Sequence, residues 1–150
     1  THIIDLFNRA NSNKIVYTNQ IDLFSRNTAG ITGSSITLEL FKTTGSAVGT
    51  AVTVSSRDST ATALSGSITC RHLLTGSATI TGTPLLGTLI YTEEGVNTRG
   101  ILPTYYNYGN ESRQPITIRA DEGIVLQQMI NRVDPRVNGS IQVNIIFTTN

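Results

Sequence analysis

Two pairs of side chains in this sequence have the residue types that catalysis uses. Asp121 and Glu122 are adjacent in "PITIRADEGIVLQQ", and two close carboxyl groups can act as acid and base if one of them stays protonated. Cys70 and His72 are two residues apart in "SITCRHLL", a spacing that places a thiol and an imidazole on one face of a strand. The sequence around each pair decides between chemistry and a structural role.

The acidic pair lies between two runs in which apolar and polar residues alternate. We interpret "ADEG" as the tight connection of a β-hairpin, in which Gly123 accepts a positive φ and Asp121 caps the backbone. In such a turn both carboxylates reach water. Nothing nearby offers the apolar surroundings that would raise a carboxyl pKa, so the sequence favours a structural role.

Cys70 and His72 continue a predicted apolar stripe with Ile68 and Leu74. Cysteine is among the most often buried residues, and catalytic Cys–His pairs usually come from distant segments with a third orienting group. A structural zinc site needs four ligands, whereas the chain has one Cys and two His. No glycine-rich phosphate loop occurs, and "NRVDPRVNG" is only loosely similar to a calcium loop. We therefore predict no enzyme activity, no catalytic residue, no metal and no cofactor.

Short strands are the elements that would position these residues. "SSITLELF" and "AVTVSS" predict a hairpin with Val52 and Val54 inward, and "SATITG" and "PLLGTLIYT" predict two separate strands. "GSIQVNIIFTT" alternates most clearly. About eight to ten strands without a helical pattern predict an all-β fold, an antiparallel β-sandwich with jelly-roll-like order. The inward positions expected in the last strand are Ile141, Val143, Ile145 and Phe147.

The N-terminal quarter differs from the rest. We predict an N-terminal arm and first strand over residues 1–30, and the sandwich domain over residues 31–150. "IDLFNR" at Ile4–Arg9 returns as "IDLFSR" at Ile21–Arg26; two similar local environments are the favoured explanation, and an arm that docks on itself or a neighbour is the other. Apolar arm residues must pack on this domain or on another subunit. The predicted partner-binding residues are Ile3, Ile4, Leu6 and Phe7.

Three nearby tyrosines form the best candidate for recognition. A tyrosine has a flat apolar face and a polar tip, which suits subunit contacts or sugar stacking, although tyrosines at strand ends also seal a core. All three interpretations stay open. These residues are Tyr105, Tyr106 and Tyr108.

Charge and composition narrow the function classes. Charged residues make up 14% of the chain and the net charge is +1, so no basic surface is expected to bind nucleic acid. No apolar run is long enough to span a membrane, and the N-terminus lacks a signal-peptide pattern, as expected if the chain is not secreted or a leader or initiator Met is gone. Polarity comes instead from about 23 Thr, 13 Ser and 12 Asn residues, typical of extracellular or virion-surface β-proteins.

The C-terminal third resembles the ending of small β-rich virion proteins of tailed bacteriophages. In those proteins a "PI-x-(L/I)-(R/K)-x-x-E-G-(I/L)" hairpin precedes the last strand, and the likeness covers roughly forty residues here. The N-terminal half shows no such likeness. The matching residues are Pro115, Ile116, Ile118, Arg119, Glu122, Gly123 and Ile124.

This resemblance implies a structural protein that decorates or cements a capsid, commonly as a homotrimer. Its expected partners are the major capsid protein and copies of itself, and its expected location is the virion, assembled in the host cytoplasm. A carbohydrate-binding or receptor-binding module, with glycan as the ligand, is the alternative. A small hydrolase using Cys70 and His72 is a weaker rival.

Overall fold

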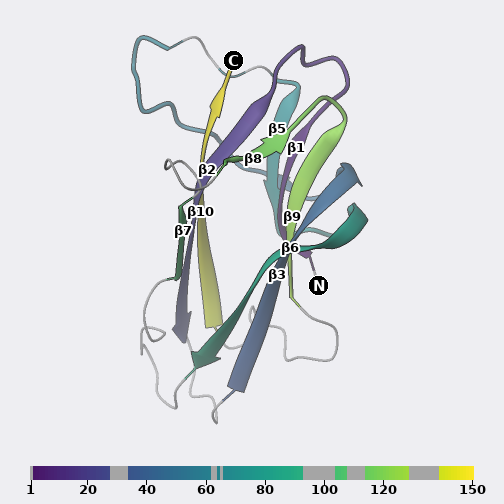
Figure 1. The fold of residues 1–150 in the computed structure, drawn as a ribbon. Coiled ribbons are helices and arrows are strands. Elements are labelled where there is room, and N and C mark those ends of the chain that lie inside the picture. The colour runs from purple at the N-terminus through teal and green to yellow at the C-terminus, as the bar shows by residue number, and fades with distance from the viewer. Residues whose placement is uncertain are drawn as a thin grey trace.

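A computed structural model describes residues 2–27, 34–61, 64, 66–92, 104–107, 114–128 and 139–150 of the chain. In this part the chain forms two antiparallel sheets that pack face to face as two layers (Figure 1). The six-stranded sheet has the order β4 (Thr50–Ala51), β5 (Ile68–His72), β1 (His2–Asn8), β9 (Glu122–Gln128), β3 (Ser34–Gly45) and β6 (Thr79–Thr92). The four-stranded sheet contains β10 (Gly139–Thr149), β2 (Val16–Asn27), β7 (Thr104–Asn107) and β8 (Ile116–Ile118).

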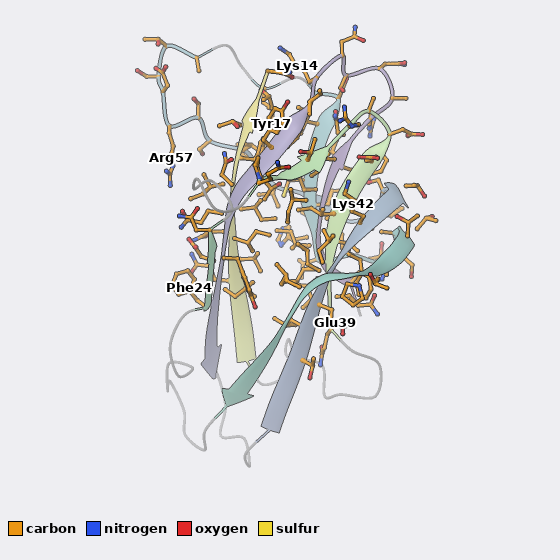
Figure 2. All side chains as sticks on the ribbon, viewed as in Figure 1. Lys14, Tyr17, Phe24, Glu39, Lys42 and Arg57 are labelled. Atoms are coloured by element: carbon orange, nitrogen blue, oxygen red, sulfur yellow. The ribbon has the colours of Figure 1, made fainter. Side chains whose placement is uncertain are left out.

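These two sheets confirm the predicted all-β sandwich. The jelly-roll order is not confirmed. In the four-stranded sheet β2 is central: β10 pairs along one side of it, and β7 and β8 pair with separate parts of its other side. The side chains of the two sheets meet in the space between the layers, as Figure 2 shows.

The main apolar core lies between the sheets and takes residues from both. Leu38 and Leu40 are 0% and 1% exposed, as the alternation in "SSITLELF" predicts. From the last strand, Val143, Ile145 and Phe147 pack against this core, also as predicted, whereas the side chain of Ile141 lies outside the described part. The buried members of the main core are Leu6, Val16, Ile21, Leu23, Leu38, Leu40, Ile68, Ile118, Ile124 and Leu126.

A β-bulge lets the long strand β2 point buried residues toward the core on both sides of Asn19. Its register with β10 shifts at Asn19, so that Phe147 pairs with Thr18 and Ile146 with Gln20. One extra residue reverses the alternation of faces. Val16 and Thr18 therefore point inward before the bulge, and Ile21 and Leu23 after it.

The predicted N-terminal arm is not confirmed, because β1 is an interior strand of the six-stranded sheet. It pairs with β5 on one side and with β9 on the other. Leu6 and Phe7 are 1% and 5% exposed. The apolar N-terminal residues thus pack on their own domain, since a strand with two neighbours leaves no backbone edge free.

Three local predictions need correction. "SSITLELF" and "AVTVSS" do not form a hairpin: β3 pairs with β6 and β9, and β4 pairs with β5. Because β4 ends at Ala51, Val52 and Val54 are not inward but 37% exposed. The two strands expected within residues 77–92 are one strand, β6, which is interrupted by a bulge.

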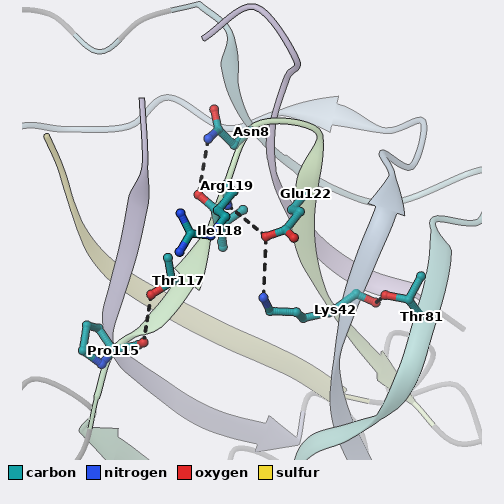
Figure 3. Close-up of polar contacts among 8 residues, drawn as sticks. All are labelled: Asn8, Lys42, Thr81, Pro115, Thr117, Ile118, Arg119 and Glu122. Carbon is teal, nitrogen blue, oxygen red and sulfur yellow. Dashed lines mark hydrogen bonds and ion pairs between the residues drawn. The ribbon is translucent and has the colours of Figure 1, made fainter. Parts of the chain in front are cut away.

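The segment Pro115–Gln128 is also not a hairpin. β8 pairs with β2 in the four-stranded sheet, whereas β9 pairs with β1 and β3 in the six-stranded sheet. The acidic turn between them therefore carries the chain from one sheet to the other (Figure 3).

Candidate functional site

The densest polar contacts on the outer face of the six-stranded sheet join Asp5, Ser46 and Arg71. Asp5 on β1 pairs in register with Arg71 on β5. The Ser46 hydroxyl donates to Oδ2 of Asp5 at 2.8 Å. Arg71 Nη1 donates to Ser46 Oγ at 2.9 Å and to the Ala47 carbonyl at 2.6 Å. A single serine therefore bridges the carboxylate and the guanidinium.

Asp5 has the environment that could support chemistry. It is 0% exposed, and burial raises the pKa of its carboxyl group, with opposing contributions from the Ser46 hydroxyl, the Ala47 backbone and the Arg71 charge. Its Oδ1 is buried without a hydrogen-bond partner. A carboxyl with a raised pKa next to a serine is one element of a general-base site.

The contacts of the cluster nevertheless match a structural role better. Arg71 donates to the same Ser46 oxygen that a nucleophile would need to present to a substrate, and it also holds the neighbouring Ala47 carbonyl. These bonds fix the loop after β3 on the sheet. Ala47 is 0% exposed there and forms a second apolar cluster with Leu74, Ala78 and Val125.

Sequence reasoning missed this cluster. Asp5 and Ser46 are 41 residues apart in the chain, and neither belongs to a recognisable motif. The available signal was a carboxylate inside the apolar run "IIDLF", since a buried charged group requires hydrogen-bond partners.

Cys70 and His72 lie in different environments. Cys70 packs against the main core, whereas His72 is exposed at the end of β5. Burial, together with the nearby Asp5 charge, raises the pKa of the Cys70 thiol to about 11. A thiol with this pKa is almost entirely protonated at neutral pH, which opposes nucleophilic attack. The predicted stripe also breaks before Leu74, because Leu73 has φ 47 and Leu74 joins the second cluster.

The acidic turn is explained by local contacts (Figure 3). Glu122 Oε2 accepts from the Arg119 backbone amide at 3.0 Å and lies 3.5 Å from Lys42 Nζ. Asp121, not Gly123, has the positive φ, at 63°. Its backbone amide donates to the Asn8 carbonyl at 2.7 Å, which ties the turn to the end of β1.

Gly123 is required for a different reason. A Cβ there would lie 2.6 Å from the Phe7 ring and 2.7 Å from both the Leu6 carbonyl and Thr43 Oγ1. The missing side chain lets the Phe7 ring lie directly over β9. The glycine of the E-G pair is therefore set by packing between strands.

The predicted partner-binding residues do not form one surface. Leu6 and Phe7 are buried, and Ile3 and Ile4 are half-buried against the main core. Tyr106 packs against the same core, and its hydroxyl donates to the Gly87 carbonyl at 3.2 Å. Tyr105 lies in β7, where its side chain is not described, and Tyr108 is outside the described residues.

Within the described ranges, no three His, Cys, Asp or Glu side chains form a group that could hold a metal ion. No helix long and apolar enough to cross a membrane occurs in that part of the chain. No protein-family model matches this sequence, and comparisons with curated proteins and with solved structures give no match either.

Proposed function

We propose that this chain is a structural virion protein that decorates or cements a phage capsid. It would bind the shell, built from the major capsid protein, and copies of itself, through surface complementarity and without catalysis. The observation that carries the proposal is the neutral character of two long strands at the margins of the sheets. β6 has 14 residues and β10 has 11, and neither contains a charged side chain.

Neutral margins suit a protein that works in many copies. Where copies in a shell meet about a two-fold axis, a charged side chain near that axis lies close to the same charge on its neighbour. Like charges across an interface are unfavourable, whereas hydroxyl and amide groups can donate and accept with any copy. A surface rich in Thr, Ser and Asn meets this requirement.

The contacts of the potentially reactive groups also support a function without catalysis. The Asp5 carboxylate and Ser46 hydroxyl hold a loop, and the Cys70 thiol packs into the core. Glu122 fixes the turn between the sheets. Each of these groups makes its contacts within the sandwich, and a surface that is preformed loses less entropy on binding.

The resemblance of the C-terminal third supports the virion setting. Two of its motif residues have definite tasks here: Glu122 bonds the turn that crosses between sheets, and Gly123 admits the Phe7 ring. Leu6 and Phe7 serve the chain's own core, so shell contact is proposed for exposed surface and not for these two residues.

Reconstitution on capsids tests the proposal. Capsids of the encoding phage, stripped of this protein, would be titrated with purified chain and sedimented. We expect binding to saturate at a fixed number of copies per shell. A chain that stays in the supernatant contradicts the proposal, and its retention on a glycan array would then support the sugar-binding alternative.

A further inference from the structure

Three of the four sheet margins are protected against pairing with another strand. An exposed edge strand offers a row of unpaired backbone groups, and proteins usually shorten or interrupt such strands. β4 has only two residues. On the far side of β2, the margin is divided between β7 with four residues and β8 with three.

β6 is long but interrupted. Leu40 pairs with Leu86 and Lys42 with Thr81, so residues 82–85 bulge out opposite Phe41 alone. This bulge contains Gly82, with φ 74, and Pro84, which has no backbone donor. A strand from another molecule could not pair continuously along β6.

β10 lacks all of these protections. It runs for 11 residues without a proline or a charge. Its bulge with β2 places the extra residue, Asn19, in β2, so β10 itself is continuous. Among the residues that the structure describes, nothing pairs with its outer side.

The side chains of β10 are also incompletely covered. Val143, Ile145 and Phe147 pack against the main core but are only half-buried, whereas Ile21 and Leu23 on the adjacent β2 are 1% and 2% exposed. A further strand beside β10 would cover the remaining apolar surface and satisfy its outer backbone groups.

We propose that β10 pairs with β10 of a second copy, antiparallel, about a two-fold axis at Asn144. This register aligns all of Gly139–Thr149, because Asn144 is the middle residue of the strand. Val143 then faces Ile145 of the partner, and Gln142 faces Ile146. The two four-stranded sheets become one continuous sheet across the dimer.

A second copy fits this margin for two reasons. Directly opposed residues of an antiparallel pair lie on the same face, so self-pairing joins the apolar face of one copy to that of the other. The absence of charge in β10 removes like-charge repulsion at the axis. The inference goes beyond the proposed function and holds whether or not the chain binds a capsid.

The geometry therefore favours a dimer over the homotrimer that the resemblance implies. A closed trimer needs two different surfaces to meet head to tail, and β10 would have to pair with one of the protected margins. An isologous dimer uses β10 twice.

Light scattering of the purified chain over a concentration series tests the pairing. We expect a dimer, and we expect Asn144→Lys to raise the dimer dissociation constant about tenfold or more, because two lysines meet at the axis. Thr83→Lys, which adds the same charge on the exposed bulge of β6, is the matched control and should stay dimeric. A monomeric or trimeric wild-type chain, or a dimer indifferent to Asn144→Lys, overturns the inference.

Cysteine cross-linking tests the register. In a Cys70→Ala background, Asn144→Cys should form an intermolecular disulfide on mild oxidation, because opposed Cα atoms of paired strands lie within disulfide range. Gln142→Cys alone should not form this disulfide, because residue 142 of one copy lies on the other side of the axis from residue 142 of the second copy. The double variant Gln142→Cys/Ile146→Cys should form it, because residue 142 faces residue 146 of the second copy. Circular dichroism checks that each variant is folded. Cross-linking through Gln142→Cys alone, and not through Asn144→Cys, contradicts the register.

Discussion

The two sheets contribute to one core, yet their outer faces and margins differ. Outside the six-stranded sheet, the loop at Ser46 and Ala47 covers a second apolar cluster, and both margins are short or bulged. Outside the four-stranded sheet, polar side chains bond to each other: Gln20 Nε2 donates to Asp22 Oδ1 at 2.8 Å, and Gln142 Nε2 donates to Asn144 Oδ1 at 3.3 Å. One sheet is covered by its own chain, and the other keeps a margin that a second molecule can extend.

The repeated "IDLF" segments show how closely the two sheets correspond. Leu6 and Leu23 both enter the main core, and Asp5 and Asp22 both lie on the opposite faces of their strands. Both strands are interior ones. Similar local environments thus account for the repeat. The two segments differ in the residues that cover their aspartates.

The largest expected effects come from truncating the two leucines of this repeat. Leu6→Ala and Leu23→Ala should each lower the free energy of unfolding by about 2–5 kcal/mol, because each removes a fully buried side chain and leaves a cavity. Denaturant unfolding at one fixed protein concentration measures both. Val48→Ala, at a position 66% exposed, is the control and should change stability by less than about 0.5 kcal/mol. A loss below about 1 kcal/mol at only one leucine would mean that the sheets do not share one core.

The next effect concerns the covered face of the six-stranded sheet. Gly123→Ala should destabilise by about 1–3 kcal/mol, because the new methyl group meets the Phe7 ring and the Leu6 carbonyl at less than 3 Å. Gly87→Ala on β6 is the matched control, since its Cβ meets no atom closer than 3.8 Å. Thermal unfolding of both variants compares them. Equal losses of stability in the two variants would show that the outer face of the six-stranded sheet is not closely packed over β9.

Alternation in the sequence was enough to predict the sandwich and much of its core. Leu38, Leu40, Val143 and Phe147 point inward because a strand with one buried face repeats every two residues. The same pattern says nothing about which strand lies alongside. "SSITLELF" was therefore matched to its neighbour in sequence, although its partners β6 and β9 come from much later in the chain.

Features set by contacts between distant segments could not be predicted. The Asp5–Ser46 bond and the fit of the Phe7 ring over Gly123 depend on strands brought together only by folding. The bulge at Asn19 changes which alternate residues of β2 point inward, and no residue type in the sequence predicts it. For the same reason, the unprotected margin of β10 becomes visible only when the sheet order is known.

A smaller effect follows from the buried carboxyl group of Asp5. Burial is the main cause that raises the pKa of Asp5 in the folded protein. The contribution of this group to stability is therefore fully present below its unfolded pKa, where Asp5 is protonated in both states. It is lost as the pH rises through the folded pKa. One such group changes the free energy of unfolding by at most about 1.4 kcal/mol per pH unit. Asp5→Asn should remove this decline above the unfolded pKa of 3.8, measured by urea unfolding across pH. Ser46→Ala, which removes a hydrogen bond that opposes the shift, should extend the decline to higher pH. An unchanged profile in both variants contradicts the assignment.

The smallest expected effect is on the reaction rate of the Cys70 thiol on β5, and not on stability. Because the pKa of Cys70 is raised to about 11, its reaction with a thiol reagent at pH 8 should be at least about tenfold slower in the folded protein than after denaturation. The Asp5 charge contributes to this shift, so Asp5→Asn should speed labelling of the folded protein modestly, whereas Glu39→Gln, on another strand, should not. The time course of labelling followed by mass spectrometry separates these cases. If the native wild-type chain is labelled as fast as the denatured chain, Cys70 is not shielded by the fold. The six-stranded sheet would then be open at β5, and the contrast between a covered sheet and an open one would fail.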